Sequence, residues 1–376
     1  MPITIGALRE RAPQETRVSL VPEVAEKFAA AGARVLIERG AGVTAQFPDG
    51  AYRKVEWADS AEAVLQSADV LLAVQPLSAA QIALLKPGAV VVGFMQAHAR
   101  HDEVRALRDR KLTSFAMELI PRISRAQSMD ALSSQAAIAG YKAVLIAANS
   151  LDKFLPMLTT AAGTIRPATV LVIGAGVAGL QAIATARRLG AVVEAYDVRS
   201  ATREQVKSLG AKFVDVGVTA EGQGGYAREL TAEERAKQQE VLDARIAASD
   251  AVITTASVPG RKAPIIVTRS AVERMKPGAV IVDIAAEQGG NCELTRLGET
   301  VVHNAVKIIG PVNLPGQLAF NASEMYARNL LNFLKPAIDQ GMLKIDWSDE
   351  VFASACLTHD GQVRHEPTRT ALEAAQ

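Results

Sequence analysis

The strongest chemical signal in the chain is a glycine-rich turn that follows an apolar segment. Residues 170–179 read Val-Leu-Val-Ile-Gly-Ala-Gly-Val-Ala-Gly, a G-x-G-x-x-G pattern between an expected strand and an alanine-rich expected helix. Such glycines allow a tight turn and let the backbone approach a pyrophosphate, which the N–H groups and the dipole of the helix then favour. The pattern therefore predicts a dinucleotide-binding loop at Gly174, Gly176, Val177 and Gly179. The alternative is that the glycines only permit a close contact between strand and helix.

An acidic residue follows the next expected strand. Asp197 stands 23 residues after Gly174, where a carboxylate can accept hydrogen bonds from the hydroxyls of an adenosine ribose. It would also repel the 2′-phosphate of NADP(H), at about 1 kcal/mol for unit charges 4 Å apart in water and roughly 4 kcal/mol at an effective dielectric near 20. Arg199, two residues later, could instead pair with that phosphate. The pattern favours NAD(H), with Asp197 as a simple strand-end cap as the alternative.

A second polar segment lies between an expected strand and a long expected helix. Residues 122–130 read Arg-Ile-Ser-Arg-Ala-Gln-Ser-Met-Asp. Two arginines, a glutamine and an aspartate at such a junction could bind a ligand. Asp130 or Ser128 would equally serve as the N-cap of the helix. From the residues alone, both interpretations stay open.

The elements that must position these residues alternate between short apolar runs and helical stretches. Pro22, for example, stands in the first turn of an expected helix that Gly32 ends. Strands are expected at residues 3–7, 34–38, 70–74, 89–94 and 113–116, and again at 170–173, 192–196, 212–216, 251–255, 279–284 and 306–309. This alternation implies parallel β-α-β units. We therefore expect an α/β protein with two Rossmann-like, doubly wound parallel-sheet domains joined by long helices.

Two long helical patterns suggest how the domains are connected. One covers about residues 130–154 and the other about 321–340, and we expect the second to return the chain to the first domain. The predicted domains are residues 1–135 with 320–376, and residues 136–319. The polar, glycine-containing segment 218–234 is predicted to be a mobile surface loop, and the tail after Gly341 reads as short and mixed.

Composition excludes several classes of function. With 41 Lys and Arg against 40 Asp and Glu, the formal charge is +1, which gives no electrostatic case for a nucleic-acid partner. Two cysteines, Cys292 and Cys356, predict reduced thiols and no metal site. The N-terminus lacks a secretory pattern. Residues 167–186 carry no charge, but a strand–turn–helix explains them better than a membrane span does, so no span is expected.

Beyond the glycine loop, several segments resemble one protein family. Residues 118–130 (Glu-Leu-Ile-Pro-Arg-Ile-Ser-Arg-Ala-Gln-Ser-Met-Asp) are similar to the NAD(H)-binding alpha subunit of proton-translocating NAD(P) transhydrogenase. Further resembling segments lie at residues 133–135, 139–141, 157–163, 174–186, 197–199, 224–227, 275–278 and 287–292. The resemblance spans about residues 3–334, and segment 122–130 is its most specific portion.

The resemblance implies a division of labour among subunits. This chain would bind NAD(H), a beta subunit would bind NADP(H), and a membrane-spanning subunit would pass protons. Hydride would move directly between the two nicotinamides in a Si/Re-specific reaction coupled to proton translocation. The resemblance also implies a homodimer that lies in the cytoplasm, peripheral on the inner face of the plasma membrane.

The same resemblance implies roles for individual residues. The nicotinamide side would comprise Arg122, Ile123, Ser124, Arg125, Gln127, Asp130 and Ser133, with Arg122, Gln127, Asp130 and Ser133 as the catalytic candidates. Gln127 would reach toward the NADP(H) of the partner. The pyrophosphate and the adenosine ribose would be held by Gly174, Gly176, Val177, Gly179, Asp197, Val198 and Arg199. Gly225 and Tyr226 would lie on a mobile loop that closes over the nucleotide.

Two other functions share portions of this pattern. Alanine dehydrogenase resembles this family, and the segment Glu15-Thr16-Arg17 matches its substrate-binding arginine segment. That enzyme also needs a lysine and a histidine, and those positions hold Gln75 and Gln96 here, so proton handling in oxidative deamination would be lost. The second alternative is a non-catalytic NAD(H) sensor, which would bind the nucleotide and never support turnover.

Overall fold

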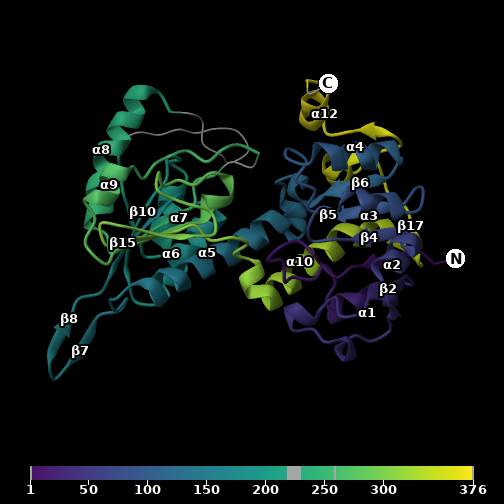
Figure 1. The fold of residues 1–376 in the computed structure, drawn as a ribbon, viewed down its shortest axis with the longest axis horizontal. Coiled ribbons are helices and arrows are strands. Elements are labelled where there is room, and N and C mark those ends of the chain that lie inside the picture. The colour runs from purple at the N-terminus through teal and green to yellow at the C-terminus, as the bar shows by residue number, and fades with distance from the viewer. Residues whose placement is uncertain (1, 218–229, 258–259, 375–376) are drawn as a thin grey trace. The chain divides into compact units, whose positions relative to one another are not determined.

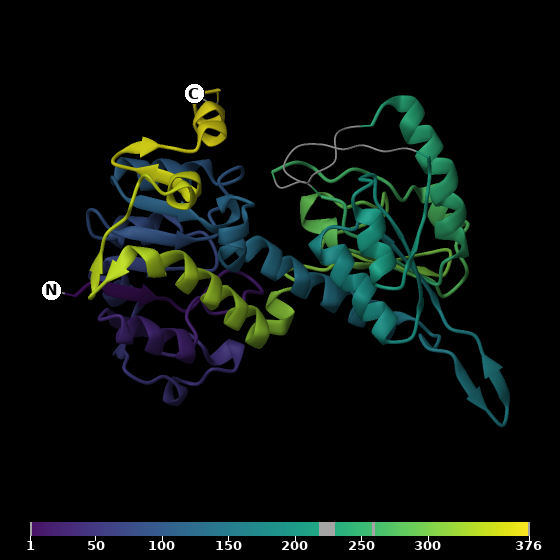
Figure 2. The ribbon, with the colours of Figure 1, turned by 180° about the vertical axis from the view of Figure 1, so that it is seen from behind.

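A computed structural model describes residues 2–217, 230–257 and 260–374 (Figures 1 and 2). The chain divides into two compact units. Unit 1 comprises Met1–Gln135 and Gly316–Gln376, and unit 2 comprises Ala136–Pro315. Each unit is built around its own mixed sheet. The chain is thus α/β with two Rossmann-like sheets, as the alternation of apolar and helical segments predicts.

The sheet of unit 1 has eight strands in the order β19-β18-β6-β5-β4-β1-β2-β3. The first six strands along the chain pair in parallel, and β18 and β19 add antiparallel strands at one edge. The strands are β1 Thr4–Ala7, β2 Arg34–Glu38, β3 Glu56–Ala58, β4 Val70–Leu72, β5 Val90–Gly93, β6 Thr113–Ala116, β18 Cys356–His359 and β19 Gln362–Val363.

Helices cover both faces of this sheet because side chains alternate along its strands. Val70 and Leu72 pack with α1 (Pro22–Ala30) and α10 (Ala319–Leu334). Leu71, from the same strand, packs on the other side with α2, α3 and α4. Those three helices are α2 Ala61–Ser67, α3 Ala79–Leu84 and α4 His101–Asp109, and α11 Glu350–Ala355 and α12 Glu366–Ala374 follow near the C-terminus.

The sheet of unit 2 has seven strands in the order β11-β10-β9-β12-β13-β15-β14. All neighbours are parallel except the edge strand β14. The strands are β9 Thr169–Ile173, β10 Val192–Tyr196, β11 Lys212–Phe213, β12 Ala251–Thr254, β13 Val280–Asp283, β14 Thr300–His303 and β15 Val306–Ile309. The order reverses beside β9, which is the switch point where open α/β sheets bind ligands.

Helices also sandwich the second sheet. Val170 and Val172 pack against α5 (Ala131–Ser150) and α6 (Val177–Arg188). Leu171, from the same strand, packs on the opposite side against α8 (Ala232–Ala248) and α9 (Arg269–Glu273), while α7 (Thr202–Ser208) joins β10 to β11.

One glycine inside α5 has a packing reason. A Cβ at Gly140 would lie 2.0 Å from the carbonyl oxygen of Ala178, so the absence of a side chain lets α5 and α6 approach closely. Among the described residues, α5 is the one helix long and apolar enough to cross a membrane, and 44% of its most apolar window is buried inside the protein. A packed core helix meets the same criterion.

The structure adds elements that the sequence interpretation missed. Residues 157–165, where no strand was expected, form a hairpin of β7 (Leu158–Thr160) and β8 (Gly163–Ile165) that projects from unit 2 with all six strand residues exposed (Figure 1). The tail after Gly341 is not merely mixed, because β18 extends the sheet of unit 1 beside β6. The second long helix ends at Leu334 and not near residue 340, where instead a short hairpin pairs Ile338–Asp339 with Met342–Leu343.

Candidate functional site

The three glycines of the loop after β9 differ in their backbone conformation and in the space around them. Gly174 has φ +95°, a conformation that favours glycine, and its N–H donates to the carbonyl of Tyr196 over 2.8 Å. At Gly179, a Cβ would lie 1.8 Å from the carbonyl oxygen of Gly174, so the helix can pack on the loop only without a side chain. At Gly176, the nearest described atom to an added Cβ is Arg199 Nη2, at 3.9 Å. The loop is therefore tight at both ends and open at its centre.

The N-terminal end of α6 has the features of an anion-binding site. Gly176 is the N-cap, and among the described residues no side chain caps it and no acidic residue stands in the first turn. The last turn carries Arg187 and Arg188, which complement the negative end of the helix dipole. Val177, the first helical residue, is exposed. The open space at Gly176 and the uncapped first turn fit a pyrophosphate.

Asp197 is buried beside this loop and is already hydrogen-bonded. Its Oδ2 accepts from the N–H of Ala175 at 2.7 Å, which ties the strand end to the glycine loop. Arg199 donates to the same carboxylate from its backbone N–H, Nε and Nη2, at 2.9, 2.8 and 2.6 Å. The positive charge of Arg199 therefore compensates the negative charge of Asp197, which was expected to repel the 2′-phosphate of NADP(H). Val198 is half-buried and packs against the adjacent core.

A polar network that the sequence did not predict supports the glycine loop from the segment that follows β12. Thr255 Oγ1 donates to the carbonyl of Gly174 at 3.0 Å. The amide of Asn291 accepts from the N–H of Ala256 at 3.0 Å and donates to its carbonyl at 2.7 Å. Asp283 lies at the end of β13 and is fully buried, and its carboxylate accepts a hydrogen bond from the N–H of Asn291 at 2.8 Å. Thr255 ends the expected strand 251–255 and Asn291 lies in the resembling segment 287–292, but only the folded sheet brings them to the loop.

Segment 122–130 is a surface turn of unit 1. Its centre is a short 3₁₀ helix, Ser124–Met129, anchored by the buried side chains of Ala126 and Met129. Ile123 is half-buried and packs on the same core. The remaining candidates on this turn, Arg122, Ser124, Arg125 and Gln127, are exposed. Two apolar anchors thus hold an exposed polar rim in place.

Asp130 performs the capping role that its position allows. Its Oδ1 accepts from the N–H of Ser133 at 2.8 Å and its Oδ2 from the hydroxyl of Ser133 at 2.6 Å, just before α5 begins at Ala131. Arg125 pairs with Asp349, the N-cap of α11, through two hydrogen bonds, and this pairing lowers the pKa of Asp349. Both candidates therefore have structural partners, and their catalytic roles stay predictions.

The candidate residues divide between the two units. Unit 1 carries Arg122 to Ser133, and unit 2 carries the glycine loop with Asp197 and Arg199. Each group is assembled within its own unit. Gly225 and Tyr226 lie outside the described residues.

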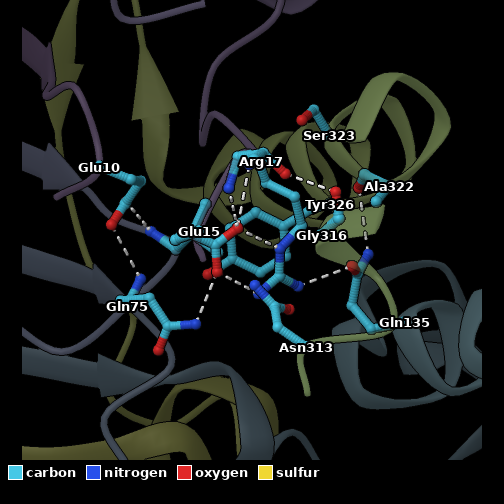
Figure 3. Close-up of polar contacts among 12 residues, drawn as sticks. Glu10, Glu15, Arg17, Gln75, Gln135, Asn313, Gly316, Ala322, Ser323 and Tyr326 are labelled. Atoms are coloured by element: carbon cyan, nitrogen blue, oxygen red, sulfur yellow. Dashed lines mark hydrogen bonds and ion pairs between the residues drawn. The ribbon is translucent and has the colours of Figure 1, made fainter. Parts of the chain in front are cut away.

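A buried polar cluster occupies the carboxyl ends of the strands in unit 1 (Figure 3). Arg17 donates to Glu15 from Nε and Nη2, at 2.8 and 2.6 Å. Gln75 donates to Glu15 at 2.7 Å, and Gln96 donates to Gln75 at 3.2 Å. Burial alone would raise the pKa of Glu15, but the bonds from Arg17 outweigh it and lower that pKa. The residues compared with alanine dehydrogenase thus lie together, around an internal carboxylate.

Two further carboxyl groups face this cluster. Glu10 accepts from the backbone N–H of Val74 at 2.6 Å, and burial together with the nearby charge of Glu15 raises the pKa of Glu10 to about 7. Glu118 accepts from the N–H groups of Met95 and Gln96, and burial raises its pKa as well.

We expect Glu10→Gln to flatten the pH dependence of stability. A carboxyl whose pKa rises from 4.5 to about 7 on folding stays protonated to higher pH in the folded state than in the unfolded state. The free energy of unfolding therefore falls as the pH rises from about 4.5 to about 7. The variant should remove that fall, which amounts to roughly 1–3 kcal/mol. Urea unfolding at pH 5 and pH 8 measures it. Equal pH dependence in parent and variant would show that Glu10 does not titrate there.

Comparison with known proteins agrees with this architecture. Residues 6–139 match the family described as Alanine dehydrogenase/PNT, N-terminal domain, and residues 143–366 match its C-terminal domain. The chain is 48% identical to the first of the polypeptides that make up NAD(P) transhydrogenase subunit alpha in Rhodospirillum rubrum, over 96% of this chain and 97% of that protein.

Solved structures show the same fold. A transhydrogenase from Sinorhizobium meliloti superposes with a TM-score of 0.87 at 45% identity, covering 96% of this chain and 99% of that one. An L-alanine dehydrogenase shares the fold with a TM-score of 0.82 at 24% identity, with both chains fully covered. The chain therefore belongs to the alanine dehydrogenase/PNT family and, within it, to the NAD(P) transhydrogenase alpha subunits.

Proposed function

We propose that this protein is the NAD(H)-binding subunit of a proton-translocating transhydrogenase. The observation that carries the proposal is the loop at Gly176, open at its centre and followed by an uncapped helix start, beside the buried carboxylate of Asp197. A bound NADH supplies the hydride, which passes to an NADP⁺ held by a separate beta subunit. A membrane-spanning subunit couples this transfer to proton movement, and this chain sits peripherally on the cytoplasmic face.

The residues of the chain would bind, orient and exclude water. Gly176 and the first turn of α6 would hold the pyrophosphate, and Asp197 the adenosine ribose. The exposed rim of unit 1, with Gln127 at its centre, would orient the nicotinamide and face the partner. Hydride transfer between two nicotinamide rings requires alignment and no protein acid or base, which agrees with the neutral amide of Gln127 at this position.

We expect Asp197→Asn to weaken the preference for NADH over NADPH. The substitution removes the carboxylate charge and leaves the guanidinium of Arg199 available to a 2′-phosphate. The dissociation constant for NADPH divided by that for NADH should fall about tenfold. A carboxylate without a neighbouring cation would give a larger change, because in the parent protein Arg199 already compensates the charge of Asp197. Fluorescence titration with both nucleotides measures the ratio. Asp215→Asn, which breaks an exposed pair with Arg203, is the matched control and should leave the ratio unchanged.

A homodimer belongs to the proposal, and the β7–β8 hairpin is its candidate contact. Leu158 and Ile165 are exposed on this projecting hairpin, and Met157 beside it is 64% exposed. A lone two-stranded hairpin is marginally stable in water and gains from a partner surface. We expect Met157→Asp with Leu158→Asp to shift the protein toward monomer in analytical ultracentrifugation. Leu297→Asp, elsewhere on unit 2 and also exposed, should not.

Alanine dehydrogenase activity is the second candidate, favoured by the Glu15–Arg17 segment. In the cluster of unit 1, however, Arg17 is buried against Glu15, and Gln75 and Gln96 bring no proton-transfer group. A simple mixture test separates the candidates. A transhydrogenase subunit oxidises NADH only when the NADP(H)-binding component is present, a dehydrogenase reduces NAD⁺ with L-alanine on its own, and a sensor does neither.

A further inference from the structure

The chain passes between its two units at two points, after Gln135 and before Gly316. Both of these residues belong to unit 1, and both are hydrogen-bonded to one short segment, residues 15–18. We call this segment the connector clamp. The hydroxyl of Thr16 donates to the carbonyl of Gly316, and Arg17 Nη1 donates to the side-chain oxygen of Gln135 at 2.8 Å.

The clamp also holds the helices that continue from the two connectors. Gln135 lies in the first turns of α5, and its Nε2 donates to the carbonyl of Ala322 in α10 at 3.1 Å (Figure 3). The N–H of Val18 donates to the hydroxyl of Ser323, also in α10, at 3.0 Å. Three hydrogen bonds thus tie Gln135, Gly316 and Ser323 to the clamp, and a fourth joins α5 directly to α10.

The clamp itself is fixed to the sheet of unit 1. Next to it, the hydroxyl of Ser19 donates to the carbonyl of Leu72 in β4 at 2.9 Å. Arg17 is 4% exposed and is held in a planar two-bond pairing by Glu15, which Gln75 holds in turn. A buried ion pair contributes little net stability compared with apolar packing, but its geometry is specific.

We propose that the connector clamp, with Arg17 as its central positioning residue, sets the direction in which the chain leaves unit 1 at both crossings, through Arg17 at Gln135 and through Thr16 at Gly316, and so limits the freedom of unit 2 to reorient. This role differs from nucleotide binding and does not depend on the proposed reaction. Few residues can act in this way, because only side chains that contact the chain near its two crossings can restrain it there.

The test measures the distance between the units in the whole protein. Spin labels are attached at Arg53→Cys in unit 1 and Gln205→Cys in unit 2, both exposed positions. The native Cys292 and Cys356 are 1% and 2% exposed, and burial raises the pKa of each thiol to about 11, so they should not compete for label. Pulsed electron resonance then gives the distance distribution, and thermal unfolding is recorded on the same samples.

We expect Arg17→Gln to broaden the distribution roughly twofold, because both the pairing with Glu15 and its fixed bond to Gln135 are lost. Thr16→Val, which removes only the bond to Gly316, should broaden it less. Arg11→Gln removes an ion pair with Glu38 from the same loop and is the matched control.

Each outcome decides the inference. Broadening in Arg17→Gln and Thr16→Val, with the control unchanged, supports the clamp. If Arg17→Gln melts at a lower temperature but keeps the parental distribution, Arg17 is only a core ion pair and the inference fails. If Arg17→Gln does not fold, Thr16→Val decides, and an unchanged distribution in that variant overturns the inference.

Discussion

Replacing Gly176 with alanine is expected to lower the affinity for NADH at least about tenfold while the protein unfolds at its parental temperature. The structure has room for the methyl group, since the nearest described atom is 3.9 Å from its position. The backbone angles at Gly176, φ −75° and ψ −167°, are also open to alanine. The same methyl group would occupy the space through which a pyrophosphate must approach the N–H groups of the turn. NADH fluorescence titration and calorimetry measure the two quantities.

Gly179→Ala is the contrasting control, with an effect on the fold itself. Its methyl group would lie 1.8 Å from the carbonyl oxygen of Gly174, so the start of α6 must move away from the loop. We expect a loss of roughly 1–3 kcal/mol in the free energy of unfolding, together with the loss of NADH binding. Parental NADH affinity in Gly176→Ala, or parental stability in Gly179→Ala, would contradict the assigned roles of these glycines.

The alternation of apolar runs and helices was sufficient to predict the parallel strands of both sheets except β3 (Glu56–Ala58), which the sequence interpretation missed. Val70 to Leu72 and Val170 to Ile173 are buried on both faces and therefore read as continuous apolar runs. The glycine loop was also predictable from the sequence, because the backbone conformation at Gly174 and the close packing at Gly179 both require glycine.

The missed elements depend on tertiary partners. The strand Cys356–His359 forms beside β6 from more than two hundred residues away, and its hydroxyl bond between Thr358 and Ser114 has no local signal. The β7–β8 hairpin carries no alternation between a buried and an exposed face, because all of its strand residues are exposed.

Site details beyond the motif were less predictable. Arg199 looked like a potential phosphate partner, but the fold directs its guanidinium onto Asp197. Arg125 faces Asp349, which lies 224 residues later in the chain. Both pairings join charged side chains through geometry that only the folded chain supplies. Asp130 was the exception, because helix capping acts between near neighbours and the sequence raised it as an alternative.

Gln127→Asn is expected to slow hydride transfer in the reconstituted mixture by about a hundredfold, while NADH affinity stays within about twofold of the parent. Gln127 is exposed on a turn whose anchors, Ala126 and Met129, remain unchanged, so the fold should persist. Shortening the side chain by one methylene withdraws the amide by about 1 Å, enough to misalign two rings that must be in contact.

Ser128→Ala serves as the control for this variant. Ser128 is exposed next to Gln127, and its backbone carbonyl, which accepts from Asn329 and Asn332, is retained. Transfer rates within about twofold of the parent are expected. If Gln127→Asn transfers hydride at the parental rate, or if Ser128→Ala slows it as much, the orienting role of Gln127 is refuted.

The central claim is that this chain holds NAD(H) for transfer to a nucleotide on another subunit. The most direct measurement mixes it with a soluble NADP(H)-binding transhydrogenase component and follows hydride transfer from NADH to an oxidised NADP⁺ analogue by absorbance, with an L-alanine control. We predict turnover in the mixture and none with either protein alone. NADH binding without turnover would contradict the claim in favour of a sensor, and NADH formation from NAD⁺ and L-alanine by this protein alone would contradict it in favour of a dehydrogenase.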